Sequence, residues 1–249
     1  MDVIYGRNTV KAAIKSGRSI DKIFAAKDLT DPSVREILAL AAQKKLPIVR
    51  VPSLRLDQLT MEFGHGGKPA NHQGVVAVAA AKDYGTIDDI FALAQQRGEP
   101  PFIVVLDGIT DEGNFGSIIR SAETLGAHGI ITGKRRSASL SAVAFKASSG
   151  AAELLPVVKV TNITTAIKKL KERDVWVAAA DASGDPADKL NLTGPLAIVV
   201  GSEGEGISRL VLEHCDYKAR IPMKGQTGSL NAAVAAAVLM YEKARQDGA

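Results

Sequence analysis

The chain has 249 residues, enough for one large domain or two smaller ones. Hydrophobic residues make up 46% of it and charged residues 23%, which describes a folded globular protein and excludes an intrinsically disordered one. The formal net charge of +4 is compatible with a nucleic-acid partner without requiring one. A single cysteine excludes an intrachain disulfide, and no apolar run reaches the roughly 18 residues of a membrane span. We therefore expect a cytoplasmic protein with no membrane partner.

The first 80 residues alternate between short helix and strand patterns. Asp31 and Pro32 mark the start of one helix, because aspartate suits an N-cap and proline the first helical turn. We interpret residues 1–81 as a small α/β domain. Its expected elements are a helix at 8–16, a strand at 20–26, a helix at 31–45, a strand at 48–51, a helix at 53–60, a turn at 64–67 and a strand at 75–80.

Residues 82–101 differ in character from what precedes them. They contain a short amphipathic helix with Ile87, Ile90 and Phe91 on one face, and they end in Pro100 and Pro101. Two consecutive prolines interrupt regular structure. We predict a linker with a short helix at 82–101 and a second domain at 102–249.

From residue 102 the pattern of strand, helix, strand repeats. Continuous apolar strands separated by helices indicate a parallel sheet with helices on both faces. The fold class is therefore α/β. The expected strands are 102–106, 129–132, 175–180, 196–200 and 217–221, and the expected helices are 115–125, 141–148, 163–173 and 231–245.

Three polar loops follow the strands at 102–106, 196–200 and 217–221. Ligands of open α/β sheets bind at the carboxyl ends of strands, so we expect these loops to form one site. Together the loops supply the candidate site residues Asn114, Arg120, Glu203, Ser229 and Asn231. Taken singly, each loop also has a plain structural interpretation: a helix cap at Asn114, a flexible turn at Glu203, and a cap at Ser229 or Asn231.

The glycine spacing of the second loop, G-x-x-G-x-G from Gly201, is not the dinucleotide fingerprint G-x-G-x-x-G. Glu203 and Glu205 in this loop would repel a pyrophosphate, whereas a cationic ligand, or one that offers hydroxyls and amines, would suit them better. Both features argue against a nicotinamide-dependent oxidoreductase. The four histidines are scattered and show no metal-binding spacing, so we expect no metal.

Two groups of basic residues stand out. Lys134, Arg135 and Arg136 follow an apolar strand, where a loop can contact RNA phosphates. Lys168, Lys169 and Lys171 lie within a predicted helix, which is typical of a solvated helix face.

The three loops, taken together and in order, resemble the three motifs of the SpoU (TrmH) branch of the SPOUT methyltransferases. The motifs are Asn-x-Gly-x-x-x-Arg from Asn114, Gly-x-Glu-Gly-x-Gly from Gly201, and Ile-Pro-Met…Ser-Leu-Asn from Ile221. Tyr5-Gly6-Arg7 and residues 71–75 are similar to the substrate-binding domain of the same enzymes, so the resemblance covers nearly the whole chain. It is strongest for the RlmB-type 23S rRNA guanosine-2′-O-methyltransferases. Glu112 stands where that family usually has proline.

The resemblance implies methyl transfer from S-adenosylmethionine to a ribose 2′-hydroxyl of 23S rRNA or of a large-subunit precursor, at a guanosine in the peptidyl-transferase region. It also implies a homodimer, a trefoil knot in the C-terminal part, an L30e-like N-terminal domain, and cofactor contacts by the backbone of Gly201, Ile221 and Leu230. Two alternatives remain open: a tRNA ribose 2′-O-methyltransferase of the same branch and a non-catalytic RNA-binding relative.

Within that chemistry we expect Arg120 to hold an RNA phosphate and stabilise the developing alkoxide. Glu203 would orient Asn114 or Arg120. Asn114, Ser229 and Asn231 would hydrogen-bond the ribose or position the arginine. The RNA-binding candidates are Arg7, Asn71, His72, Gln73, Lys134, Arg135 and Arg136.

Overall fold

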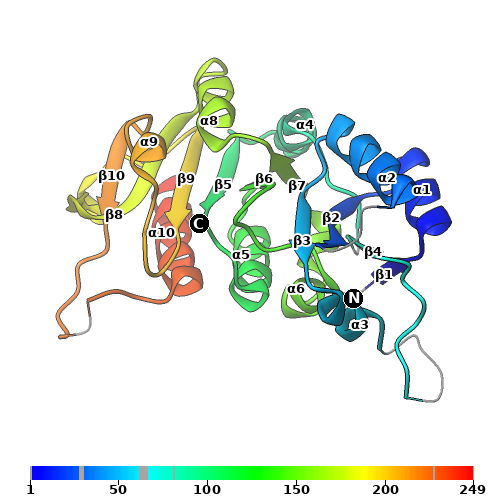
Figure 1. Ribbon diagram of the computed structural model, residues 1–249. Helices are drawn as coiled ribbons and strands as arrows, with labels where there is room; N and C mark the ends of the chain where they lie inside the picture. Colours follow the sequence, from blue (N-terminus) through cyan, green and yellow to red (C-terminus); the bar gives the residue numbers. More distant parts are fainter. Residues whose placement is uncertain (1, 28–30, 62–66, 81, 227, 249) are drawn as a thin grey trace. The chain divides into compact units, whose positions relative to one another are not determined.

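The computed structural model describes residues 2–27, 31–61, 67–80, 82–226 and 228–248 (Figure 1). The chain forms two compact units, Met1–Asp83 with Leu140–Ala142, and Tyr84–Ser139 with Val143–Ala249. The turn predicted at 64–67 falls largely on residues 62–66, which lie outside the described residues.

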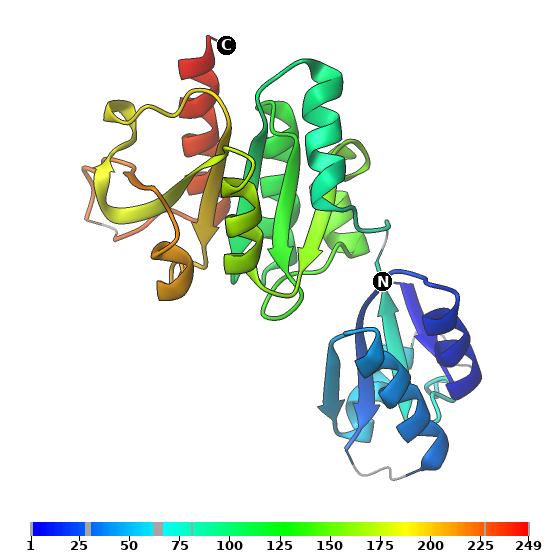
Figure 2. The same cartoon turned by 90° about the horizontal axis from the view of Figure 1, so that it is seen from above.

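The first unit is built on a four-stranded sheet in the order β1-β4-β2-β3. Strand β4 is antiparallel to β1 and β2, and β3 is parallel to β2. Helices α1 and α2 lie side by side (Figure 2), and their apolar residues share one core with the sheet. The elements are β1 (Asp2–Tyr5), α1 (Arg7–Lys15), β2 (Ile20–Ala26), α2 (Pro32–Gln43), β3 (Ile48–Val51), α3 (Ser53–Thr60) and β4 (Val75–Ala79).

Helix α2 begins as the sequence predicts. The Asp31 carboxylate accepts the Ser33 N–H at 2.8 Å, and Pro32 occupies the first helical position. The helix ends two residues before the predicted residue 45. Lys45 has a φ of 56°, a left-handed conformation that ends a helix.

The second unit contains a six-stranded sheet in the order β10-β8-β9-β5-β6-β7, and all its strand pairs are parallel. This confirms the predicted parallel sheet. Figure 1 shows α4 and α8 on one side of it and α5 and α10 on the other. The elements are α4 (Ile87–Arg97), β5 (Phe102–Asp107), α5 (Glu112–Thr124), β6 (Gly129–Gly133), α6 (Ala142–Ala147), α7 (Ala151–Leu154), β7 (Val157–Val160), α8 (Ile163–Lys171), β8 (Trp176–Pro186), the 3₁₀ turn η2 (Ala187–Lys189), β9 (Leu196–Gly201), α9 (Arg209–Leu212), β10 (Tyr217–Arg220) and α10 (Ala232–Asp247).

The central strands β5 and β9 are buried on both faces. Val104 and Val105, which point to opposite faces of β5, are both fully buried, as expected for strands that helices cover from both sides. Because these strands are fixed on both faces, the loops at their carboxyl ends start from rigid positions.

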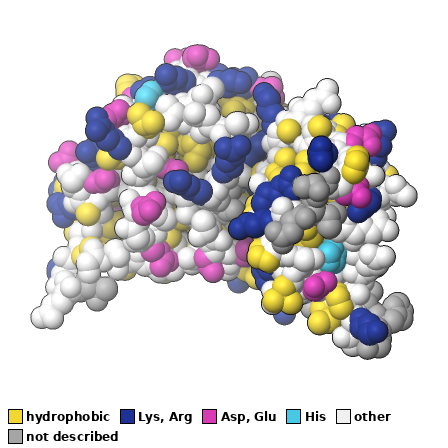
Figure 3. Space-filling model, in the orientation of Figure 1, with side chains coloured by type: hydrophobic (Ala, Val, Ile, Leu, Met, Phe, Trp, Pro, Cys, Tyr) yellow, Lys and Arg dark blue, Asp and Glu magenta, His cyan; other side chains and the backbone are white. Residues whose placement is uncertain are grey.

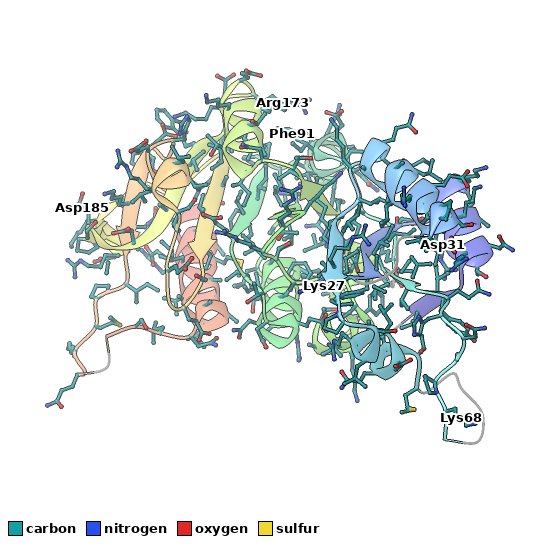
Figure 4. The ribbon with its side chains drawn as sticks, viewed as in Figure 1. Lys27, Asp31, Lys68, Phe91, Arg173 and Asp185 are labelled. Carbon is teal, nitrogen blue, oxygen red and sulfur yellow. The ribbon has the colours of Figure 1, made fainter. Side chains whose placement is uncertain are left out.

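Helix α4 belongs to the core of the second unit, although it falls within the segment predicted as a linker. Ile90 is fully buried and packs with Ile103 and Val158. On the outer side, the Arg173 guanidinium lies 4.6 Å from the centre of the Phe91 ring and pairs with Asp88 (Figure 4). The chain between the two predicted domains is thus packed structure for at least the length of α4.

Candidate functional site

The loops after β5 and β9 are adjacent because these two strands are neighbours in the sheet. The Asp107 carboxylate, at the end of β5, accepts the N–H of Ser208 at 2.8 Å, which ties the loop after β5 to the loop after β9. The start of α10 completes the site. The sheet therefore brings together loops separated by about a hundred residues of sequence.

Asn114, Glu203 and Asn231 form a hydrogen-bonded group that we call the amide–carboxylate cluster. Glu203 Oε1 accepts Asn114 Nδ2–H at 3.0 Å and Asn231 Nδ2–H at 2.6 Å. Asn231 Nδ2 also donates to Asn114 Oδ1 at 2.9 Å. Three of the five residues predicted to be catalytic are thus in direct contact.

Asn231 serves the cluster and the fold at once. Its Oδ1 accepts the N–H groups of Ala233 and Val234 at 3.0 and 3.3 Å, which makes it the N-cap of α10. Its Nδ2 is the group that bonds within the cluster. The structural and functional interpretations of this residue are therefore both compatible with the geometry.

The capping interpretation of Asn114 is wrong. Asp111 is the N-cap of α5, and its carboxylate accepts the Asn114 N–H at 2.7 Å. The Asn114 side chain is left to bond Glu203. Glu112, where the family usually has proline, is the first residue of α5, a position that proline also favours. The substitution leaves the helix start in place.

A pocket of about 200 Å³ lies beside the middle of β8 and the carboxyl ends of β9 and β10, and it opens to solvent. The three predicted cofactor contacts, Gly201, Ile221 and Leu230, all line it, as do Glu203 and Ser229. Among the described residues, its lining includes two carboxylates and no lysine, arginine or histidine. A cationic ligand that also offers hydroxyl and amine groups fits this lining.

The loop at Gly201 is closed rather than open. Ser202 and Gly206 exchange backbone hydrogen bonds of 3.1 and 2.9 Å. A Cβ atom at position 201 would lie 2.1 Å from the carbonyl carbon of Gly206, so only glycine fits there. The backbone at Gly201 is thus part of the pocket wall.

An apolar groove runs from the cluster between α5 and α10. Asn114 and Asn231 lie among its lining residues, and the rest of the groove is mostly small or apolar. Val234 is 48% exposed and Tyr241 59% exposed on the α10 side. The cluster therefore lies between a polar pocket and an open apolar surface.

Arg120 and Ser229 are not part of the cluster. Arg120 is exposed on α5, six residues and about 9 Å along the helix axis from Asn114. Its guanidinium makes no hydrogen bond or ion pair with any residue that the structure describes. Ser229 is exposed and lines the pocket. The structure thus leaves the arginine available to a ligand that approaches from outside.

The RNA-binding candidates of the first unit are held by internal bonds. Arg7 donates to the Gln73 carbonyl oxygen at 3.1 Å and pairs with Asp31 at 2.9 Å. His72 Nδ1 accepts the Gly74 N–H at 3.0 Å, so its Nε2 carries a hydrogen and donates to Asp57, also at 3.0 Å. Asn71 is exposed. These bonds fix the shape of the loop at residues 71–74, which presents Asn71 to solvent.

The basic loop of the second unit is less constrained. Arg135 and Arg136 are exposed and Lys134 is half-buried, directly after β6. Their side chains pair with no carboxylate in the part of the chain that the structure describes. The lysines of α8 are also exposed, and Figure 3 shows basic side chains over that helix.

Asp181 also lines the pocket, although the sequence reasoning missed it. We predicted that this strand would end at Ala180, but β8 continues to Pro186. The available signal was an acidic residue directly after a predicted apolar strand, at the edge where the other candidates lie.

Within the described ranges, no three acidic, histidine or cysteine side chains are arranged to hold a metal ion. No described helix is long and apolar enough to cross a bilayer.

Comparison with known families matches both parts of the chain. The SpoU rRNA Methylase family matches residues 101–241, and the family of RNA 2′-O ribose methyltransferase substrate-binding domains matches residues 3–85.

Similar proteins extend over the same length. The protein YacO of Bacillus subtilis, assigned to the TrmH family of tRNA/rRNA methyltransferases, is 41% identical over 98% of this chain and 96% of its own. A Staphylococcus haemolyticus protein assigned to that family is 42% identical, over 98% of this chain and 95% of its own.

Two solved structures have folds similar to that of this chain. The SpoU methyltransferase AviRb from Streptomyces viridochromogenes, in complex with AdoMet, has a TM-score of 0.61 and 28% identity, covering 98% of this chain and 89% of its own. A TrmH/SpoU tRNA modifying enzyme from A. aeolicus has a TM-score of 0.55 and 27% identity, covering 59% of this chain and 76% of its own.

Proposed function

This chain belongs to the SpoU rRNA methylase family and is an RNA methyltransferase, and from that premise we propose its donor, acceptor and target. It transfers the methyl group of S-adenosylmethionine to a ribose 2′-hydroxyl of 23S rRNA or of a large-subunit precursor. The target is a guanosine in the peptidyl-transferase region, and the protein works in the cytoplasm without a metal.

The observation that carries this proposal is the position of the amide–carboxylate cluster at the wall of the acidic pocket. Glu203 belongs to both. The pocket has two carboxylates and no basic lining residue among those described, which suits a sulfonium cation. Backbone groups at Gly201, Ile221 and Leu230 would hold the cofactor.

The cofactor supplies an electrophilic methyl group with its leaving group, so the protein has to orient a weak nucleophile and stabilise its developing charge. Asn114 retains one amide hydrogen, and Glu203 one carboxylate oxygen, without a partner among the described residues. These groups, together with Ser229, bind the ribose, and Asn231 holds Asn114 and Glu203 in position. Arg120 stays protonated in almost any site, so it acts by holding a phosphate and stabilising the alkoxide.

Replacement of this arginine tests the proposal. We expect Arg120→Ala to reduce methyl transfer at least 100-fold, because a stabiliser of transition-state charge is lost. Affinity for S-adenosylmethionine should change less than threefold, because Arg120 does not line the pocket. Single-turnover transfer from labelled cofactor measures the first quantity and calorimetry the second. A variant with the wild-type rate would contradict the role of Arg120.

A tRNA target is the second candidate. The A. aeolicus tRNA modifying enzyme matches only 59% of this chain, whereas the substrate-binding family matches residues 3–85. This additional domain favours the larger RNA. Equal transfer to purified tRNA and to 23S rRNA would remove that preference. A non-catalytic RNA-binding protein would need no cofactor, so heat on titration with S-adenosylmethionine argues against it.

The RNA contacts are the exposed Asn71 and the basic loop at Lys134, Arg135 and Arg136. Arg7, His72 and Gln73 contribute by fixing the loop that carries Asn71. Contacts of lysine and arginine with phosphate weaken as salt rises.

The apolar groove between α5 and α10 is the dimer interface in this proposal. Val234, Val238 and Tyr241 are each more than a third exposed on one face of α10. Large exposed apolar patches mark interaction surfaces. A second copy packed there would cover the groove next to Asn114 and Asn231.

A further inference from the structure

The pocket contains a second carboxylate, that of Asp181, which has no role in the methyl transfer described above. Asp181 lies in β8, is half-buried, and lines the pocket with Ala180 and Ala182. It is separate from the amide–carboxylate cluster, since no hydrogen bond joins it to Asn114, Glu203 or Asn231 in the part of the chain that the structure describes.

The Asp181 side chain is fixed and charged. Its Oδ1 accepts the backbone N–H of Ser183 at 2.7 Å and also the Ser183 hydroxyl. The hydroxyl bond is the largest cause that holds the pKa of Asp181 below its ordinary value; the N–H bond and the nearby Lys218 act in the same direction. The second oxygen, Oδ2, has no partner among the described residues.

The position of Asp181 shows which part of a ligand it can meet. Strand β8 pairs with β9 on one side and β10 on the other, whereas Asn114 comes from the loop after β5. Asp181 is therefore at least one strand further from the reacting groups than Glu203 is. The pocket wall around it is apolar, with Ala182, Ala219 and Ile221, and such a wall suits an aromatic base.

We propose that Asp181 binds the ribose hydroxyls of the cofactor's adenosine through its unpartnered oxygen, and so positions the nucleoside against the apolar wall. A carboxylate oxygen can accept hydrogen bonds from the hydroxyls of a cis-diol, and in dinucleotide-binding sheets an acidic residue accepts one from the ribose 2′-hydroxyl. The assignment rests on the proposed function, because it takes S-adenosylmethionine as the ligand.

Calorimetry with three ligands tests the assignment. S-adenosylhomocysteine has the base, the ribose and the amino acid; 5′-methylthioadenosine lacks the amino acid; and adenine lacks the ribose too. We expect Asp181→Asn to weaken the first two about tenfold, which is about 1.4 kcal/mol for one hydrogen bond to a charged group, and to leave adenine unchanged. Asp185→Asn is the matched control, because Asp185 lies on the same strand, is exposed and does not line the pocket (Figure 4).

The three ligands separate the possible failures. If 5′-methylthioadenosine binds Asp181→Asn as it binds wild type, the carboxylate does not meet the ribose and the assignment is wrong. If wild type binds neither S-adenosylmethionine nor S-adenosylhomocysteine, the proposed function fails first. Thermal unfolding checks that the variant folds. Ser183→Ala removes only the hydroxyl that holds the carboxylate. We expect it to weaken the affinity for the same two ligands by less than Asp181→Asn does. Unchanged affinities would show that the assignment is wrong.

Discussion

The residues of the cluster could be chosen from the sequence, but their bonds could not. Asn114, Glu203 and Asn231 stand out because each follows an apolar strand in a glycine-rich loop. Nothing in the sequence says that one oxygen of Glu203 accepts from both amides. Asp111 illustrates the limit, because both Asp111 and Asn114 are suitable caps by composition and only the backbone geometry selects Asp111.

The two tasks of Asn231 can be separated by substitution. Serine also caps helices but is too short to make both amide bonds, so we expect Asn231→Ser to change the free energy of unfolding by less than about 0.5 kcal/mol. Asn231→Ala should lose about 1 kcal/mol, since the cap is gone. Both variants should lose methyl transfer by at least tenfold. Chemical denaturation and transfer rates measure the two effects, and a serine variant with full activity would show that the amide has no catalytic part.

At the scale of elements, the parallel sheet follows from continuous apolar runs, and strands such as β5 and β9 are predicted within a residue of their ends. Strands β1 and β7 were missed. Each has only four residues, and Lys159 interrupts the apolar run of β7. Short edge strands are defined by their neighbours in the sheet more than by their own sequence.

The closed loop after β9 gives a prediction about the pocket. We expect Gly201→Ala to weaken S-adenosylmethionine at least tenfold, because its Cβ would displace the backbone of Gly206. Gly204→Ala is the matched control, since a Cβ there meets nothing within 4 Å and the residue lies in the same loop. Calorimetry on both variants measures the effect, and equal affinities would show that the loop does not form the binding wall.

Histidine 128 joins the segment before β5 to the start of β6. Its Nδ1 accepts the Phe102 N–H at 3.0 Å, and its Nε2 donates to Glu99 at the same distance. Burial is the main cause that lowers the pKa of His128, with the Glu99 bond opposing it. The folded protein therefore favours the neutral ring more than the unfolded chain does.

This bond pattern predicts a loss of stability in acid. Below pH about 6.5 the unfolded chain binds a proton that folded His128 resists, so the free energy of unfolding falls as pH decreases, by at most about 1.4 kcal/mol per pH unit. Above that pH the contribution is complete. Asparagine can still accept the Phe102 N–H and does not titrate, so His128→Asn should show a shallower decline between pH 7.5 and 5. Urea denaturation across this range measures it, and parallel curves would assign the decline to other groups.

At the scale of the whole molecule, the sequence predicts the division into two domains, but it does not predict the apolar groove between α5 and α10. The first ten residues of α10 are apolar all round, so the buried and exposed faces there look alike in the sequence. The trefoil knot and the homodimer stay predictions that derive from the resemblance.

The dimer prediction can be checked on one face of one helix. We expect the protein to elute as a dimer, and Val238→Glu to shift it to monomer, because a charge would be buried in the interface. Glu213→Lys, at the residue that follows α9 and away from the groove, should leave the dimer intact. Light scattering coupled to size-exclusion chromatography gives the mass, and a wild-type monomer at micromolar concentration would exclude this interface.

The central claim is that the loops after β9 and β10 bind a methyl donor beside the amide–carboxylate cluster, for transfer to an rRNA ribose. Mapping 2′-O-methylation of 23S rRNA and tRNA in cells with and without the gene tests it most directly. We predict that one guanosine of 23S rRNA loses its methyl group without the gene, regains it with the wild-type gene, and does not regain it with Arg120→Ala. Identical maps of both RNAs in the two strains would contradict the account.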